Sequence, residues 1–284
     1  MTPAAPVVAL ASADLLGEGP WWDERTGTLV RVDIRARAVR RWHPASGSTA
    51  ETVLPDEVSL ALPRRTGGLV VTQVDRVGLL DADGRLEDLV DVEATNPETR
   101  LNDGACDDDG LLWVGTYSPR MKPDAGLHVV RPDGSAEQVL DGLVASNGLA
   151  WHGDLLYAVD TGRAVVDRYR RGPGTTLRPL GPLVELDPAT ELPDGIALDR
   201  EGAVWVAVLK AGEVRRYLPD GRVDVVVPVP VTSPTSVAFG GAGLDRLFVT
   251  SSSYALPPDH AEPAGSVLEI RPGVRGVPVR RFAG

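Results

Sequence analysis

The apolar residues of this chain come in short runs that alternate with glycine, proline and acidic residues. Runs such as GLVVTQV, LLWVGTY, AVWVAVL and RLFVTSS are rich in β-branched and aromatic residues, which is typical of strands. Asp-Gly pairs, for example Asp133-Gly134 and Asp220-Gly221, predict tight turns between such runs. No long stretch has apolar residues at helical spacing, because proline or glycine interrupts most windows. The pattern predicts an all-β protein.

The same runs recur at a regular interval. In NDGACDDDGLLWVGT, SNGLAWHGDLLYAVD and PDGIALDREGAVWVA, a polar residue precedes a glycine, and an aromatic residue follows in the next run. The marker glycines Gly104, Gly148 and Gly195 are spaced 44 and 47 residues apart. EGPWWDERTGTLVRVD and PTSVAFGGAGLDRLFVT fit the same template, and a weaker copy begins near Val58.

Six such units, each with room for four short strands, account for almost the whole chain. Repeats of about 40–47 residues are typical of β-propeller blades. A β-sandwich also alternates strands and turns, but it does not repeat at this interval. The sequence therefore predicts a single domain over residues 1–284, a six-bladed β-propeller with four-stranded blades around a central channel.

Charge and composition exclude several function classes. The 284 residues carry a net charge of −11, which gives no attraction for nucleic acid or for an anionic membrane. A single cysteine, Cys106, allows neither an intrachain disulfide nor a cysteine-based zinc site. No serine-hydrolase, P-loop or dinucleotide-binding motif is present. The N-terminal stretch lacks a basic segment followed by an apolar one, so we expect it to belong to the fold and the protein to be cytoplasmic.

Oxygen-bearing side chains occupy one position of the repeat. The residues directly before the marker glycines are Glu18, Asp103, Asn147 and Asp194. Equivalent positions of propeller blades converge on the channel, where carboxylates repel one another unless a cation lies between them. Such oxygen ligands suit Ca²⁺ or Mg²⁺ better than zinc. Asp and Asn before glycine are also common turn residues, but Glu18 does not fit this alternative, because Glu is not a turn former.

Four motifs in order over about residues 15–250 resemble the signatures of the SMP-30/gluconolactonase/regucalcin family. They read LGEGPWWD, RLNDGACDDDGLLWVGT, SNGLAW and LPDGIALDREGAVWVA. The resemblance implies a six-bladed propeller with one divalent cation in its channel. It also implies hydrolysis of a lactone, because many members of the family act on sugar lactones.

The resemblance also assigns roles to individual residues. Glu18, Asn147 and Asp194 match the three metal ligands, and Asp194 also matches the catalytic general base. Arg100 and Asn102 match the pair that binds the oxygen atoms of the substrate. Ca²⁺ is the favoured ion, with Zn²⁺, Mn²⁺, Mg²⁺ and Fe²⁺ as alternatives.

Two further residues stand near these motifs. Asp103 is a neighbouring carboxylate that we expect to contact the metal through water. Arg120, in GTYSPRMKPD, lies near the place where sugar lactonases of the family carry an acidic residue. We expect Arg120 to bind substrate, and its opposite charge changes which lactone fits.

The expected function is therefore a metal-dependent lactonase that uses an activated water. Two alternatives stay open. One is a metal-dependent hydrolase or specialised-metabolism enzyme acting on a non-sugar substrate, such as a phosphotriester. The other is a non-catalytic calcium-binding propeller. In each case the expected partner is a small molecule, and the protein is expected to be a monomer or a weak homo-oligomer.

Overall fold

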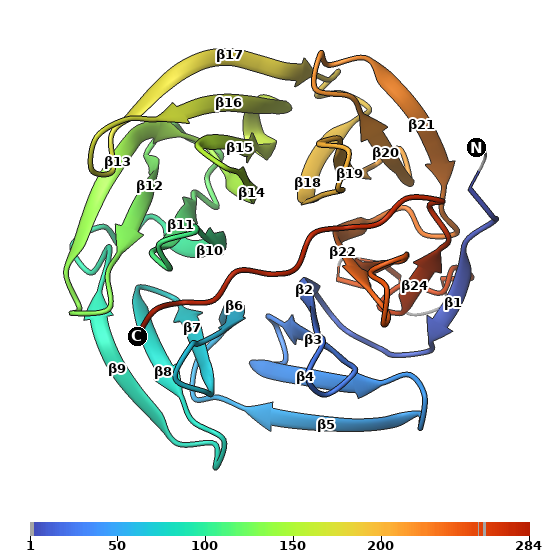
Figure 1. Ribbon diagram of the computed structural model, residues 1–284, viewed down its shortest axis with the longest axis horizontal. Coiled ribbons are helices and arrows are strands. Elements are labelled where there is room, and N and C mark those ends of the chain that lie inside the picture. Colours follow the sequence, from blue (N-terminus) through green and yellow to red (C-terminus); the bar gives the residue numbers. More distant parts are fainter. Residues whose placement is uncertain (1–2, 255, 258–259) are drawn as a thin grey trace.

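The computed structural model describes residues 3–254, 256–257 and 260–284. Its strands form six four-stranded antiparallel sheets arranged as blades around a central channel (Figure 1). In the described residues, the helical structure is one 3-10 turn at Thr161–Arg163, and no helix is long and apolar enough to span a membrane. The predicted six-bladed propeller is confirmed.

The blades follow one another in chain order, and the first strand of each lies innermost (Figure 1). Blade 1 contains β2 (Gly17–Asp23), β3 (Thr28–Asp33), β4 (Ala38–His43) and β5 (Ser48–Val53). Blade 2 contains β6 (Val58–Pro63), β7 (Leu69–Gln73), β8 (Arg76–Leu80) and β9 (Leu86–Asp91). Blade 3 contains β10 (Arg100–Cys106), β11 (Leu112–Tyr117), β12 (Ala125–Val130) and β13 (Ala136–Leu143).

The second half of the ring repeats this arrangement. Blade 4 contains β14 (Ser146–His152), β15 (Leu155–Asp160), β16 (Val165–Arg171) and β17 (Leu177–Glu185). Blade 5 contains β18 (Leu192–Leu198), β19 (Val204–Leu209), β20 (Glu213–Tyr217) and β21 (Val223–Pro228). Blade 6 contains β22 (Pro234–Gly240), β23 (Arg246–Ser251), β24 (Val267–Ile270) and β1 (Val7–Leu10).

Blade 6 is built from both ends of the chain. Strand β1 pairs antiparallel with β24, with Val7 opposite Glu269 and Val8 opposite Leu268. The N-terminal segment thus supplies the outermost strand of the last blade. This pairing closes the ring without a covalent link and leaves β24 with a partner on each side.

The repeated aromatic residues pack between neighbouring blades. The rings of Trp113 in blade 3 and Trp151 in blade 4 meet edge to face, with centroids 4.8 Å apart. Trp205 in blade 5 meets Phe239 in blade 6 in the same way, at 6.1 Å. The indole nitrogen of Trp113 donates to Asp107, the first residue of the DDDG turn between β10 and β11. The repeated aromatic residues therefore hold neighbouring blades together.

The C-terminal segment, residues 271–284, leaves blade 6 and crosses the end of the channel (Figure 1). We call this segment the C-terminal strap. Its main chain or side chains bond to residues at the far ends of the innermost strands or in the turns that follow them. The bonds join Gly276 N to Leu244 O (2.8 Å), Val277 N to Leu198 O (3.3 Å), Arg280 Nη1 to Trp151 O (2.6 Å), Phe282 N to Pro63 O (2.9 Å) and Ala283 N to Gly110 O (2.9 Å).

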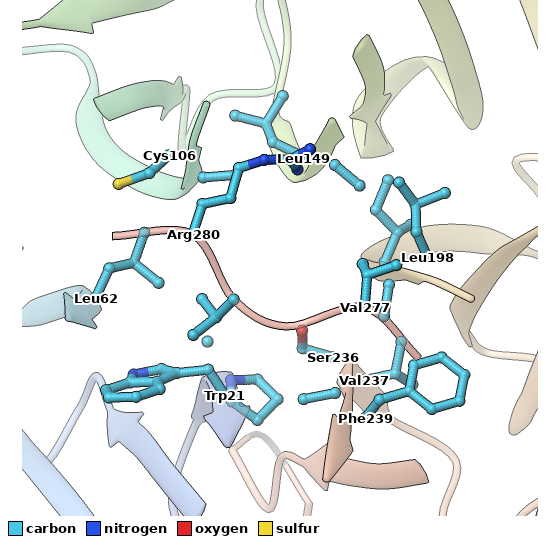
Figure 2. Close-up of a pocket in the computed structure, with 18 of the residues that line it drawn as sticks. Trp21, Leu62, Cys106, Leu149, Leu198, Ser236, Val237, Phe239, Val277 and Arg280 are labelled. Atoms are coloured by element: carbon cyan, nitrogen blue, oxygen red, sulfur yellow. The ribbon is translucent and has the colours of Figure 1, made fainter. Parts of the chain in front are cut away.

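The strap lines a cavity of about 140 Å³ inside the channel (Figure 2). Val277 and Arg280 of the strap form one side of this cavity, and apolar residues of the innermost strands form most of the rest. Asp103 lines it as well. Because the strap covers the ends of the innermost strands and the oxygen donors lie near their beginnings, strap and donors are at opposite ends of the channel.

Candidate metal and substrate site

The four oxygen donors of the repeat all lie on innermost strands. Glu18 is on β2, Asp103 on β10, Asn147 on β14 and Asp194 on β18. In each strand the pairing with its neighbour shifts register around the donor: between residues 18 and 21, 101 and 104, 146 and 149, and 193 and 196. Such bulges turn a side chain out of the regular alternation of the strand. The bulge therefore gives the donors of these four blades the same local backbone setting.

The marker glycines allow the innermost strands to approach one another closely at the channel. A Cβ atom on Gly148 would lie 2.6 Å from the main-chain oxygen of Asp194. A Cβ atom on Gly195 would lie 1.9 Å from the hydroxyl of Ser236. Both distances are shorter than real carbon contacts, so only glycine fits at these positions. The close approach brings Asn147, next to Gly148, beside the strand that carries Asp194.

The three carboxyl groups of the site interact with one another. Burial, followed by the charge of Asp103, raises the pKa of Glu18 to about 8. Burial raises the pKa of Asp103 to about 6. Burial, then the charges of Glu18 and Asp103, raises the pKa of Asp194 well above its usual value. Burial is the largest cause of each shift, and for Glu18 and Asp194 the charges of neighbouring carboxylates add to it.

The hydrogen bonds of Glu18, Asn147 and Asp194 leave oxygen atoms of these side chains available to an ion. Glu18 Oε2 accepts from Gly19 N at 3.1 Å, and Asn147 Nδ2 donates to Thr161 Oγ1 at 3.1 Å. The second bond leaves the amide oxygen of Asn147 as the atom that can bind a cation. Asp194 Oδ1 is buried and has no hydrogen-bond partner in the described part of the chain, and such an unpaired buried oxygen costs free energy unless an ion or water binds it.

The amide oxygen of Asn147 is the third oxygen of the predicted ligand set. Among the described residues, no three His, Cys, Asp or Glu side chains lie close enough together to hold a metal ion by themselves. The predicted set has two carboxylates, Glu18 and Asp194, and the amide supplies the third oxygen. Carboxylate and amide oxygens are ligands that Ca²⁺ accepts. The residues present therefore fit a hard divalent cation.

Arg100 and Asn102 lie together beside the donors. Arg100 Nη1 donates to Asn102 Oδ1 at 3.3 Å and to Leu101 O at 3.0 Å, and its guanidinium lies 5.1 Å from the ring centre of Tyr117. Burial lowers the pKa of Arg100, and the nearby charge of Arg35 lowers it further. The charges of Glu57 and Glu18 act in the opposite direction, so Arg100 is a buried cation that lies near carboxylates and can donate to oxygen atoms of a ligand.

Asn102 and Arg120 differ in how they are held. Asn102 Nδ2 donates to Ser146 O at 2.9 Å, so each end of its amide already has one partner, and each end can make one more bond. Arg120 lies between β11 and β12, is 60% exposed and forms an ion pair with Glu98. Its contact is therefore with Glu98, whereas Arg100 and Asn102 bond directly to each other.

Thr161 is the residue that sequence reasoning missed. Its hydroxyl links Asn147 of blade 4 to the main chain of blade 5, through Pro193 O at 2.7 Å. The residue follows strand β15 and does not share the repeat position of the donors. A polar residue at the end of an apolar run is the signal in the sequence, but many such residues only form turns.

Known proteins resemble this chain over almost its full length. The family model for the SMP-30/Gluconolactonase/LRE-like region matches residues 16–253. A 6-deoxy-6-sulfogluconolactonase of Pseudomonas putida is 35% identical over 282 residues, covering 95% of this chain and 96% of that protein. Regucalcin of Gallus gallus is 32% identical over 284 residues, covering 95% of both chains.

A solved structure has the same fold as this chain. The crystal structure of a calcium-binding protein, regucalcin, from Agrobacterium tumefaciens matches with a TM-score of 0.91 and 28% identity, over 100% of this chain and 99% of that one. The similarity thus includes all six blades as well as the sequence motifs. The chain belongs to the SMP-30/gluconolactonase/LRE-like family.

Proposed function

We propose that the protein is a divalent-metal-dependent lactonase that acts on a sugar lactone or a related small lactone. The observation that carries the proposal is the buried Oδ1 of Asp194, which has no partner among the described residues and lies near Glu18 and Asp103, whose charges add to burial in raising its pKa. A relative with 35% identity is named as a lactonase of a sulfonated sugar, which supports a lactonase role for this chain.

Glu18, Asn147 and Asp194 would hold the cation. Their oxygen donors favour Ca²⁺, and the solved relative named as a calcium-binding regucalcin supports this choice. Zn²⁺, Mn²⁺, Mg²⁺ and Fe²⁺ are the alternatives that the test below includes. A cation bound here would polarise the lactone carbonyl and lower the pKa of a bound water.

The residues of the chain itself supply the remaining steps. Asp194 accepts a proton from the attacking water, as a carboxylate at a buried site can. Arg100 and the free bonding positions of Asn102 hold the oxygen atoms of the substrate, and this fixes the carbonyl for attack. Asp103 stays a neighbouring carboxylate that reaches the cation through water.

Substrate approaches from the donor end, because the C-terminal strap covers the other end of the channel. We propose that Arg120 contacts a substituent of the substrate there. Arg100 and Arg120 give this end two cationic side chains, although Glu98 pairs with the second. A lactone with an anionic substituent is therefore a second candidate, and the name of the Pseudomonas putida relative describes such a lactone.

A substrate panel tests the proposal. Metal-free protein, prepared by chelation, is assayed with sugar lactones, anionic lactones, aryl esters and phosphotriesters after addition of Ca²⁺, Mn²⁺, Zn²⁺ or Mg²⁺. We expect lactone turnover that chelation abolishes and one of the ions restores. Turnover of phosphotriesters alone supports the non-sugar hydrolase. Tight ion binding without any turnover supports a non-catalytic calcium-binding propeller, and the absence of ion binding refutes the metal site.

The acidic site predicts how stability depends on pH. The raised pKa values of Glu18 and Asp103 mean that the folded metal-free protein keeps protons that the unfolded chain has already lost. Without metal, their contribution to the free energy of unfolding therefore falls as pH rises from about 4 to about 8. An ion binds the deprotonated groups, so added Ca²⁺ should stabilise more at pH 8 than at pH 6.

Urea unfolding at several pH values, with and without Ca²⁺, measures this effect. Glu18→Gln is the control, since an amide does not titrate, and the variant should show a flatter pH dependence without metal. Equal stabilisation by Ca²⁺ at pH 6 and pH 8 would contradict the prediction.

A further inference from the structure

Side chains from neighbouring blades hold the main chain directly ahead of each oxygen donor. In each case a hydroxyl or amide donates to the carbonyl of the residue that precedes Glu18, Asp103, Asn147 or Asp194. The bonds are Thr235 Oγ1 to Gly17 O, Ser59 Oγ to Asn102 O (2.9 Å), Asn102 Nδ2 to Ser146 O (2.9 Å) and Thr161 Oγ1 to Pro193 O (2.7 Å). We call these four donating residues the girdle.

Thr161 differs from the other three girdle residues because it also bonds to the side chain of a proposed metal ligand, Asn147. Its hydroxyl gives its single hydrogen to Pro193 O and accepts from Asn147 Nδ2 at 3.1 Å. The residue is 8% exposed, and its own main-chain nitrogen donates to Ala145 O at 2.9 Å. Thr161 is therefore fixed in place, and both bonding functions of its hydroxyl are in use.

The amide of Asn147 has two chemically opposite ends. Its oxygen can bind a cation, whereas its NH₂ group repels one. Because the hydroxyl of Thr161 has already given its hydrogen to Pro193, it can only accept from Asn147. The NH₂ group is thereby held on the Thr161 side, and the oxygen is left for the ion.

We propose that Thr161 is a positioning residue of the metal site. It selects the oxygen end of Asn147 for the cation and fixes the peptide ahead of Asp194, so that one hydroxyl aligns ligands from blades 4 and 5. This inference rests on the proposed function, because it concerns the same ion. Residues that orient metal ligands in this way typically change metal affinity by about 10–100-fold when they are replaced.

Calorimetric titration of metal-free protein with Ca²⁺ tests the role of Thr161. Thr161→Val removes the hydroxyl with little change in volume, and we expect its dissociation constant to rise by about 10–100-fold. Thr161→Ser keeps the hydroxyl and should restore binding close to that of the wild type. Circular dichroism and thermal unfolding show whether each variant is folded, and Thr161→Ala is the replacement if Thr161→Val is not.

Two comparison variants separate positioning from a general loss of packing. Thr116→Val removes a buried hydroxyl that bonds to the main chain of Gly126, and should leave the dissociation constant unchanged. Thr235→Val removes the girdle bond to Gly17 O, which involves no side chain of a proposed metal ligand. This variant should weaken Ca²⁺ binding less than Thr161→Val.

A double-mutant cycle with Asn147→Asp gives the sharpest result. Both oxygens of a carboxylate can bind the ion, so the orientation chosen by Thr161 no longer matters. Thr161→Val should therefore weaken binding much less in the Asn147→Asp protein than in the wild type, which is a measurable coupling. Wild-type affinity of the folded Thr161→Val protein, or equal losses in both backgrounds, would overturn the inference. Absence of ion binding to the wild type would instead refute the proposed function.

Discussion

Asp194→Ala is expected to lower lactone turnover by about 10²–10⁴-fold, because the residue is proposed both to hold the cation and to accept the proton of the attacking water. Its side chain is only 4% exposed, and Oδ1 has no partner among the described residues. The measurements are kcat and kcat/KM at saturating metal, together with the dissociation constant of the ion.

Asp194→Asn separates the two proposed roles of this residue. The amide keeps an oxygen for the ion but is a very poor proton acceptor, so we expect the variant to bind metal and to turn over lactone slowly. Asp199→Asn is the matched control: Asp199 is also a buried aspartate of blade 5, but it bonds to Arg216 and Trp205 at the far end of β18. The Asp199→Asn variant should be less stable than the wild type, but each folded molecule should turn over lactone at the wild-type rate. Near-wild-type turnover of Asp194→Ala would remove Asp194 from the mechanism.

Phe282→Ala is expected to lower the free energy of unfolding by about 3–5 kcal/mol, the range for loss of a buried phenylalanine. The ring of Phe282 is fully buried and belongs to a core cluster with Leu62, Leu80 and Leu112. Its main chain bonds to blade 2 through Pro63 O and Arg65 N. Loss of the ring thus removes packing from the core and weakens the attachment of the C-terminal strap.

Urea unfolding, monitored by tryptophan fluorescence, measures this effect. Val277→Ala is the control in the same segment, because Val277 is 39% exposed and its truncation should cost far less. We also expect Phe282→Ala to speed hydrogen exchange of the main chain around Pro63 and Phe282. A loss of stability no larger than that of Val277→Ala would show that the strap is a surface feature that does not support the fold.

The parts of the fold that repeat could be predicted from sequence. The aromatic residues Trp113, Tyr157 and Trp205 mark the second strands of three blades, and all three are buried. The outermost strands gave a weaker signal. Strand β5, for example, has almost entirely exposed residues, and its sequence STAETV has no apolar run. Such strands are held by their neighbours rather than by their own burial.

Candidate donors could also be found from sequence, because their repeat position is set by short-range chemistry. The glycine after each of Asp103, Asn147 and Asp194 is required by a close approach of main chains, and glycine is visible in the sequence. The bulges that turn the donors toward the axis were not visible, since a bulge depends on the partner strand. The raised pKa values likewise depend on the burial of the carboxyl groups in the folded chain and then on how near they come to one another.

The amino-acid sequence by itself determined the blade repeat, the all-β fold and the position of each oxygen donor within its blade, because these follow from the order of apolar, turn and glycine residues along a short stretch. Only the tertiary structure decided that Thr161 bonds to Asn147 and Pro193, that β1 completes blade 6 and that the C-terminal strap closes the channel. Each of these contacts joins segments from different blades or from opposite ends of the chain. No local pattern records them, because the partner is chosen by the closure of the ring.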